Sequence, residues 1–339
     1  MRVAMYYSNN DVRCEEMPVP KIGPGEVLVK VKASGICGSD CLEWYRLQSA
    51  PKVLGHEITG DVDKVGEGVE NFKRGDRVFV SHHVPCNTCH YCVNDNHTVC
   101  ETLHTTNFDP GGFAEYVRVP RINVDRGTFL LPDDLSYDDG VFIEPVACVV
   151  RGQRKAGIAL GQTVLILGSG FSGLLHLVLA KASGVTRVIC TDVSDYRLGM
   201  AEKLGATAAI QAKEYSPEKL KEANAGRLAD LVIVCTGAPT AFEQALKSVD
   251  RGGTILCFAT TEPDVKLEVP LNEFWRNGIT IMPSYAGAPA DIRIAIELLR
   301  AGVFPTKELT THEFPLESCS EGFRLVSEAG ESMKVVLKP

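Results

Sequence analysis

Residues 163–173 read T-V-L-I-L-G-S-G-F-S-G, and this stretch decides the fold of the second half of the chain. Its first five residues form a continuous run of four apolar side chains after Thr163, which is typical of a parallel strand buried on both faces. The pattern G-x-G-x-x-G follows directly and opens a helix predicted over 170–182, which favours a phosphate-binding loop over a chance glycine-rich turn. Gly168 allows the tight turn, Gly170 lets the backbone approach a pyrophosphate, and Gly173 allows helix and strand to pack closely.

Strands and helices alternate around this stretch, as expected for a parallel sheet with helices on both faces. The predicted strands lie at 187–191, 231–235, 254–258 and 279–282, and the predicted helices lie at 196–204, 241–249 and 290–299. We therefore predict a doubly wound nucleotide-binding domain over residues 148–286.

The second predicted strand of this domain ends at Thr191-Asp192, about twenty residues after the glycine motif. A carboxylate at this position can hydrogen-bond both ribose hydroxyls of NAD, and it repels the 2′-phosphate of NADP. The alternative is a chance aspartate after a glycine-rich turn. Arg197 either contacts the adenosine or is a solvated helix arginine, and the residues alone leave both interpretations open.

Residues 1–147 have a different pattern of short strands separated by glycine-rich turns such as 23–25. The clearest predicted strands lie at 26–32, 58–62 and 77–80. This pattern indicates an antiparallel, all-β first domain. The last segment, 287–339, ends in a strand predicted at 333–337 and lacks the nucleotide-fold pattern, so we expect it to return to the first domain.

Four cysteines follow the spacing C-x2-C-x2-C-x7-C, and we expect them to form a lobe over about 82–106. They are Cys86, Cys89, Cys92 and Cys100. Four thiolates this close together suit a closed, tetrahedral zinc site of structural type. A ferredoxin-type cluster is the nearest alternative, but its last gap is three residues with a proline after the fourth cysteine. Here the gap is seven and Glu101 follows, which favours zinc over a cluster or over unrelated cysteines.

A second group of residues has the types that a catalytic zinc needs. Cys37 lies in A-S-G-I-C-G-S-D, His56-Glu57 follow a glycine, and Glu144 precedes a proline. Taken singly, these are a buried thiol, a satisfied polar residue and a charge at a helix N-terminus. Together they offer one thiolate, one imidazole and two carboxylates, whereas a catalytic zinc takes three protein ligands and keeps a fourth position open.

These motifs together resemble the zinc-containing medium-chain dehydrogenases, and most of all their sorbitol (polyol) and threonine dehydrogenase branch. The resemblance extends over essentially the whole chain. Besides the cysteine lobe it rests on G-I-C-G-S-D at 35–40, G-H-E at 55–57, E-P at 144–145, G-x-G-x-x-G at 168–173 and T-D-V-S-x-x-R at 191–197. It implies an α/β protein with a GroES-like β catalytic domain and a Rossmann domain.

The resemblance also implies roles for individual residues. It places a catalytic zinc at Cys37 and His56, with Glu57 and Glu144 as alternating or water-mediated ligands; alcohol dehydrogenase relatives have a cysteine in place of Glu144. Ser39 is expected to be the first proton acceptor. The expected cofactor contacts are Gly168, Gly170, Ser172, Gly173, Asp192, Arg197, Cys235, Thr236, Phe258, Thr260, Pro283 and Ser284.

Two positions depart from the family pattern. Many relatives carry a histidine five residues after the cysteine ligand, where it passes the proton to solvent, and this chain has Leu42. Sorbitol dehydrogenases have an Arg-Tyr pair near the substrate, and this chain has Ser284-Tyr285. The first departure puts the usual proton exit in doubt, and the second weakens a claim that sorbitol itself is the substrate.

Composition narrows the partners. The 339 residues carry a net charge of −8 with no long basic run, which argues against nucleic acid and anionic membranes as partners. Twelve cysteines without a signal-peptide pattern indicate a reducing compartment, so we expect a cytoplasmic protein. The resemblance suggests a homodimer or homotetramer, joined through the edge strand at 279–282.

We therefore expect an enzyme with NAD and two zinc ions per chain, one catalytic and one structural. The predicted reaction moves a hydride from a secondary alcohol of a polyol, sugar, cyclitol or amino alcohol to NAD and leaves a ketone. A threonine dehydrogenase or a simple secondary-alcohol dehydrogenase of the same fold is the alternative. A non-catalytic nucleotide-binding protein is a more distant one, because such a protein has no need of an open metal site.

Overall fold

The computed structural model describes all residues from 1 to 339, and the chain divides into two compact units. The first unit consists of Met1–Ala147 and Ala286–Pro339, and the second consists of Cys148–Tyr285. The C-terminal segment therefore belongs to the same unit as the N-terminal half. Helix α6 (Ile143–Lys155) contains the point at which the chain passes from the first unit to the second.

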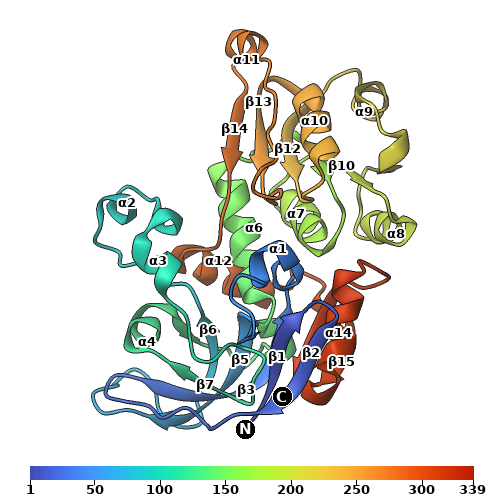
Figure 1. The fold of residues 1–339 in the computed structure, drawn as a ribbon. Coiled ribbons are helices and arrows are strands. Elements are labelled where there is room, and N and C mark those ends of the chain that lie inside the picture. The colour runs from blue at the N-terminus through green and yellow to red at the C-terminus, as the bar shows by residue number, and fades with distance from the viewer. The chain divides into compact units, whose positions relative to one another are not determined.

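The second unit is built on a six-stranded parallel sheet in the order β11-β10-β9-β12-β13-β14 (Figure 1). The strands are β9 (Thr163–Leu167), β10 (Arg187–Asp192), β11 (Ala208–Gln211), β12 (Ala229–Val234), β13 (Val249–Cys257) and β14 (Thr280–Pro283). The strand order reverses between β9 and β12. From β9 the chain adds β10 and β11 on one side, and from β12 it adds β13 and β14 on the other. In open sheets of this type, ligands bind beyond the carboxyl ends of the strands at this reversal.

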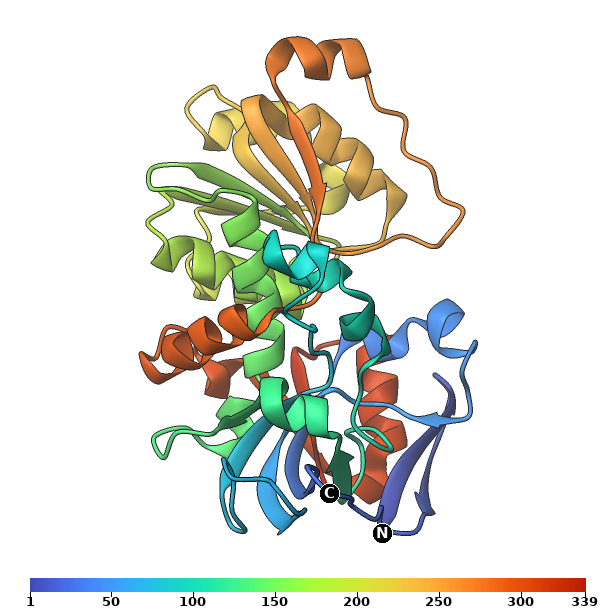
Figure 2. The ribbon, with the colours of Figure 1, turned by 90° about the vertical axis from the view of Figure 1, so that its left-hand side faces the viewer.

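Helices cover both faces of this sheet (Figure 2). They are α7 (Phe171–Ala182), α8 (Asp195–Lys203), α9 (Pro217–Ala223) and α10 (Pro239–Ser248), whereas α11 (Leu271–Asn277) lies beyond the ends of β13 and β14 at the top of Figure 1. On one face, Phe242 of α10 packs into a buried cluster with Leu165 and Val232. The predicted doubly wound sheet is confirmed, and β9 occupies the predicted residues. Strand β11 escaped prediction because it has four residues, all half-buried, and so shows neither alternation nor a buried apolar run.

The first unit contains a seven-stranded sheet in the order β15-β16-β3-β5-β6-β8, with β7 also paired to β3. Its strands are β3 (Val27–Ile36), β5 (Glu57–Val65), β6 (Arg77–Ser81), β7 (Tyr116–Val119), β8 (Thr128–Leu130), β15 (Thr310–Pro315) and β16 (Lys334–Lys338). A smaller sheet has the order β2-β1-β4, formed by β1 (Arg2–Ser8), β2 (Asp11–Glu16) and β4 (Lys52–Val53). Strand β16 pairs antiparallel with β3, so the end of the chain lies beside its first long strand.

The expectation of an all-β first domain is wrong in detail, because short helices connect its strands. They are α1 (Glu43–Arg46), α2 (His90–Val93), α3 (Glu101–Thr105), α4 (Arg121–Gly127) and α5 (Tyr137–Gly140), and the C-terminal segment adds α12 (Pro289–Arg300), α13 (Thr306–Leu309) and α14 (Cys319–Ser327). Helix α12 confirms the helix predicted at 290–299. The helices α1 to α5 and α13 have only four to seven residues, too few for a 3.6-residue period to show. The longest helix, α6, has 13 residues, and no helix combines the length and apolarity needed to cross a membrane.

Candidate active site and zinc lobe

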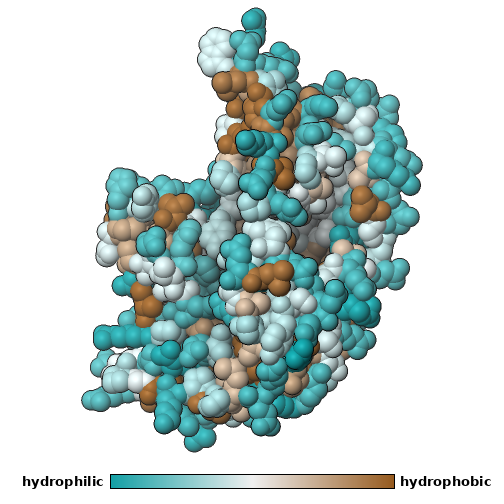
Figure 3. Space-filling model, viewed as in Figure 1, coloured by the Kyte–Doolittle hydropathy of each residue, from teal (hydrophilic) through white to brown (hydrophobic).

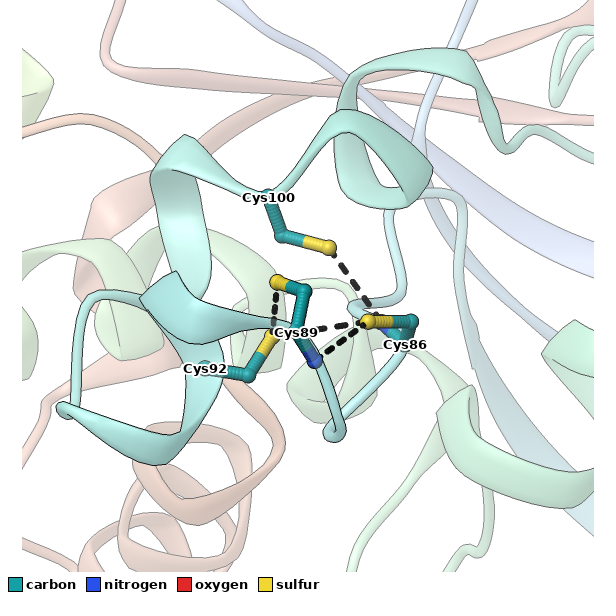
Figure 4. A group of neighbouring side chains, drawn as sticks. All are labelled: Cys86, Cys89, Cys92 and Cys100. Atoms are coloured by element: carbon teal, nitrogen blue, oxygen red, sulfur yellow. Dashed lines mark hydrogen bonds between the residues drawn. The ribbon is translucent and has the colours of Figure 1, made fainter.

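Four cysteines in the loop after β6 direct their sulfur atoms toward one another (Figure 4). All four sulfur atoms lie within 4.8 Å of one another. The Sγ atoms of Cys89 and Cys92 are 3.5 Å apart, and those of Cys86 and Cys92 are 4.0 Å apart. A tetrahedral zinc with Zn–S bonds of about 2.3 Å needs sulfur atoms about 3.8 Å apart. The lobe therefore has the donor set and the spacing of a closed zinc site.

Backbone groups of the lobe prepare these sulfurs for a cation. The N–H groups of Thr88 and Cys89 donate to the Sγ of Cys86, which together with the Thr88 hydroxyl lowers the pKa of the Cys86 thiol to about 5. The N–H of Cys86 in turn donates to the Sγ of Cys100 at 3.4 Å. Burial raises the pKa of Cys92 to about 12, so this thiol needs a metal ion to ionise at neutral pH.

The second cluster of ligand types comes from the ends of two paired strands. Strands β3 and β5 run antiparallel with Gly35 opposite Glu57. Cys37 directly follows β3 and His56 directly precedes β5, so both residues lie at the same end of the strand pair. The ligand atoms of Cys37, His56 and Glu57 lie within 4.8 Å of one another. A Cβ at position 35 would overlap the Oε2 atom of Glu57, so a larger residue there would displace this carboxylate.

Asp40, which the sequence interpretation did not single out, orients both of these ligands. It lies in the 3₁₀ turn Gly38–Cys41 and is fully buried. One carboxylate oxygen accepts the N–H of Cys37 at 3.1 Å, and the other is 3.4 Å from Nδ1 of His56. The remaining ring nitrogen of His56 is therefore free to act as a ligand, in the arrangement by which a carboxylate fixes the tautomer of a metal-bound histidine. The sequence did contain a signal for Asp40. It lies three residues after Cys37, which is the spacing of a capping box.

The charge of Asp40 also acts on the pKa of its neighbour. Burial lowers the pKa of His56, but the charge of Asp40 and the hydrogen bonds to Asp40 and Cys37 outweigh it and raise this pKa well above its usual value of about 6.5. Burial raises the pKa of Asp40, but the contacts of this carboxylate with His56 and Arg46 outweigh burial and lower its pKa. The carboxylate therefore stays ionised at neutral pH and strongly polarises the imidazole.

Glu57 is held by a lysine from the far end of the chain. Both side chains are buried, and Nζ of Lys334 on β16 lies 2.6 Å from Oε2 of Glu57. The same ammonium donates to the carbonyl oxygen of Ile36 at 3.3 Å. Oε1 of Glu57 is buried without a hydrogen-bond partner, so it has lone pairs available for a cation beside Cys37 and His56. The sequence interpretation did not identify Lys334, because Lys334 and Glu57 are 277 positions apart and no local pattern links them.

Ser39 and Arg46 complete the surroundings of Cys37. The hydroxyl of Ser39 lies 3.4 Å from the Sγ of Cys37. Arg46 donates through Nε to the carbonyl of Ser39 at 2.9 Å, and its Nη2 lies 3.4 Å from the Ser39 hydroxyl. Glu144 lies in α6 and is not part of the close group of three ligands, so its role at the metal stays a prediction.

The glycine loop of the second unit has the geometry that its sequence predicts. Gly168 adopts a φ of +96°, which favours glycine, and its N–H donates to the carbonyl of Thr191. At Gly173 a Cβ would overlap the carbonyl oxygen of Gly168, so only glycine lets α7 pack this closely on the loop. Arg197 lies beside the loop, with its Nη1 3.7 Å from where a Cβ of Gly170 would be.

Asp192 ends β10 and ties the glycine loop to the start of α8. One oxygen accepts the N–H of Ser169 at 2.7 Å and the other accepts the N–H of Ser194 at 2.9 Å. Arg197 approaches the first oxygen at 3.9 Å. Each carboxylate oxygen has two lone pairs, so Asp192 retains acceptor sites for further hydroxyl donors.

The remaining expected cofactor contacts lie at the carboxyl ends of neighbouring strands or at the start of α7. Cys235 follows β12 and donates its N–H to Leu167 at the end of β9, and a Cβ on Gly168 would lie 3.2 Å from Thr236. After β13, the N–H of Phe258 donates to Val234, and the N–H of Ser284 after β14 donates to Cys257. Thr260 and Pro283 lie in the same two segments, and Ser172 is in the first turn of α7. The parallel sheet thus gathers these segments at one edge, and their contacts with the cofactor stay predictions.

Known proteins share both halves of this arrangement. The alcohol dehydrogenase GroES-like domain family matches residues 23–127, and the zinc-binding dehydrogenase family matches residues 173–301. Sorbitol dehydrogenase of Bacillus subtilis is 33% identical over 100% of this chain and 97% of its own length. L-threonine 3-dehydrogenase of Bacillus licheniformis is 35% identical over 96% of this chain and 94% of its own.

A solved structure extends the similarity to the fold. The 2R,3R-butanediol dehydrogenase of Bacillus subtilis superposes with a TM-score of 0.86 and 28% identity, and the match covers 100% of this chain and 99% of that one. Two family matches, full-length relatives above 30% identity and this superposition agree with one another. The chain belongs to the zinc-containing medium-chain alcohol and polyol dehydrogenases, an oxidoreductase family.

Proposed function

We propose that this protein oxidises a secondary alcohol within a polyol, sugar, cyclitol or amino alcohol to a ketone, with NAD as the hydride acceptor. The observation that supports this most directly is the group formed by Cys37, His56 and Glu57, whose ligand atoms lie within 4.8 Å and which Asp40 orients from behind. Thiolate, imidazole and carboxylate are zinc donors, and the orphaned Oε1 of Glu57 suits a cation at this point. A zinc ion held there would supply Lewis-acid polarisation of the alcohol oxygen.

The residues around Cys37 have the chemistry to receive the alcohol proton. The Ser39 hydroxyl can accept a proton from the substrate and pass its own to water. Arg46 favours transient negative charge on this hydroxyl, because its guanidinium lies 3.4 Å away and is always ionised. Leu42 has no group that could carry the proton further, so ordered water completes the exit.

We propose NAD rather than NADP as the cofactor, and two zinc ions per chain. Asp192 lies at the end of β10, where its charge would repel a 2′-phosphate. The four cysteines of the lobe would hold a structural zinc without taking part in the reaction. None of the twelve cysteines forms a disulfide, which supports a reducing compartment such as the cytoplasm.

We also propose that two copies associate through the edge of the second unit's sheet. Strand β14 is the last of the sheet and has no neighbour on its outer side. Figure 3 shows apolar surface over β14 and α11, where Leu271, Trp275 and Ile281 are exposed. Unpaired strand edges flanked by exposed apolar side chains are unusual unless another chain covers them. Light scattering of the protein and of Ile281→Lys tests this association.

The reaction is tested by following NADH formation over polyols, inositols, sugars, amino alcohols and plain secondary alcohols. Threonine belongs in this panel, because the similarity to a threonine dehydrogenase extends over nearly the whole chain. Higher kcat/KM for threonine than for every polyol would replace the proposed substrate class with an amino acid. Absence of NAD reduction with every alcohol would refute the proposed function.

A further inference from the structure

His82 lies beside the proposed catalytic ligands and has no assigned role. It directly follows β6, and the register between β5 and β6 places Ser81 opposite Glu57. The imidazole rings of His82 and His56 are therefore close, with centroids 4.8 Å apart. The buried side chain of Asn123 donates to the carbonyl oxygens of Ser81 and His82, at 2.9 and 2.8 Å, which fixes the backbone at this point.

The ring of His82 has an unsatisfied polar atom. Its Nδ1 is buried and has no hydrogen-bond partner. Buried polar atoms are hydrogen-bonded in the great majority of cases, and leaving one unpaired costs free energy. His82 as a whole residue is half-buried. Its other contacts are with the edge of His83, 3.9 Å away between centroids, and with Phe108 at 6.4 Å, and neither satisfies a ring nitrogen.

We propose that His82 determines substrate specificity by hydrogen-bonding a second hydroxyl, on the carbon next to the one that is oxidised. The substrate is then a vicinal diol or a polyol that contains one. This inference rests on the proposed function, because the reacting oxygen must first reach the position defined by Cys37 and His56. A group that packs against the ring of His56 lies beside that position, and an imidazole always offers at least one N–H donor.

The test compares two alcohols with the same carbon skeleton, 2,3-butanediol and 2-butanol, with His82→Phe. Phenylalanine keeps an aromatic ring against His56 and removes both ring nitrogens. The variant should lower kcat/KM for the diol about tenfold, which is about 1.4 kcal/mol and the upper end of what one hydrogen bond contributes. For 2-butanol the change should stay within about threefold. His82→Gln, which retains a donor and an acceptor, should keep more of the diol preference.

A matched control makes the same replacement elsewhere. The control is His312→Phe. His312 lies on β15, where its ring stacks on Phe314, and the substitution should leave kcat/KM unchanged for both alcohols. Zinc content and the melting temperature of each variant show whether the metal ligands and the fold survive. Calorimetric titration of the NADH complex with the diol measures binding without turnover, and His82→Phe should weaken this binding about tenfold.

The possible outcomes separate the two levels of the proposal. Equal losses for both alcohols, or no loss for the diol, would overturn the role of His82 and leave the proposed reaction intact. If the parent enzyme oxidises neither alcohol while it binds the diol more tightly than His82→Phe does, the reaction has failed and the contact stands. Diol binding that is identical in the parent and in His82→Phe would overturn the contact regardless of turnover.

Discussion

Removing the ammonium of Lys334 should expose how much the Glu57–Lys334 pair contributes to stability. The two side chains are 0% and 1% exposed, and their charged atoms are 2.6 Å apart. Lys334→Met replaces the ammonium with an apolar group of similar length and leaves the Glu57 carboxylate buried without its partner. Breaking a buried ion pair in this way costs about 3–5 kcal/mol. We expect that loss, because nothing else in contact with Oε2 of Glu57 carries a positive charge.

Hydrogen exchange at the amides of β3 and β16 measures the effect where the pair lies. A loss of about 3 kcal/mol or more corresponds to exchange at least about a hundredfold faster in these two strands. Lys338→Met is the matched control, since Lys338 is on the same strand and pairs with Asp138 and Glu313 at the surface. Exposed pairs contribute about 0–1 kcal/mol, so the control should change exchange less than about fivefold.

A double variant decides whether charge is the cause. Glu57→Gln combined with Lys334→Met removes both charges and should recover most of the loss. The loss should also be smaller in the zinc-loaded protein than in the zinc-free protein if Glu57 turns to the metal. Two results would refute this account of the pair. One is a free energy of unfolding of Lys334→Met within about 1 kcal/mol of the parent, and the other is a double variant no more stable than Lys334→Met.

Three further outcomes follow from the site. Cys92→Ser should mainly lower folding stability and remove one zinc, whereas Cys37→Ser should remove activity and keep the fold; metal analysis showing two zincs and normal turnover in Cys37→Ser would contradict the catalytic site. The parent should prefer NAD over NADP by about a hundredfold or more in kcat/KM, since two unit charges 4 Å apart repel by about 4 kcal/mol at an effective dielectric of 20 and partial solvation reduces this repulsion. Asp192→Ser should narrow this ratio, and equal efficiencies in the parent would disprove the role of Asp192. Ser39→Ala should lower kcat well below that of Leu42→Ala, and steady-state kinetics showing Ser39→Ala equal to the parent would remove Ser39 from the proton path.

The sequence by itself determined the features that a long apolar run or a fixed spacing of neighbouring residues specifies. The apolar run 163–167 is β9 to the residue, and the glycine motif after it forms the predicted turn. The four lobe cysteines converge as their spacing indicates, because fifteen residues of loop leave few other arrangements. The adjacent His56 and Glu57 and the family motif around Cys37 likewise pointed to residues whose ligand atoms lie within 4.8 Å of one another.

Only the tertiary structure decided how that cluster is held. Asp40 orients His56 from a turn that the sequence shows merely as part of a motif, and Lys334 reaches Glu57 only because β16 pairs with β3. His82 meets His56 through the register of β5 and β6. These contacts join residues far apart in the chain, and strand register is set by the burial of whole faces of the sheet. Local sequence patterns are short compared with these separations, so they cannot specify which distant side chain satisfies a buried charge.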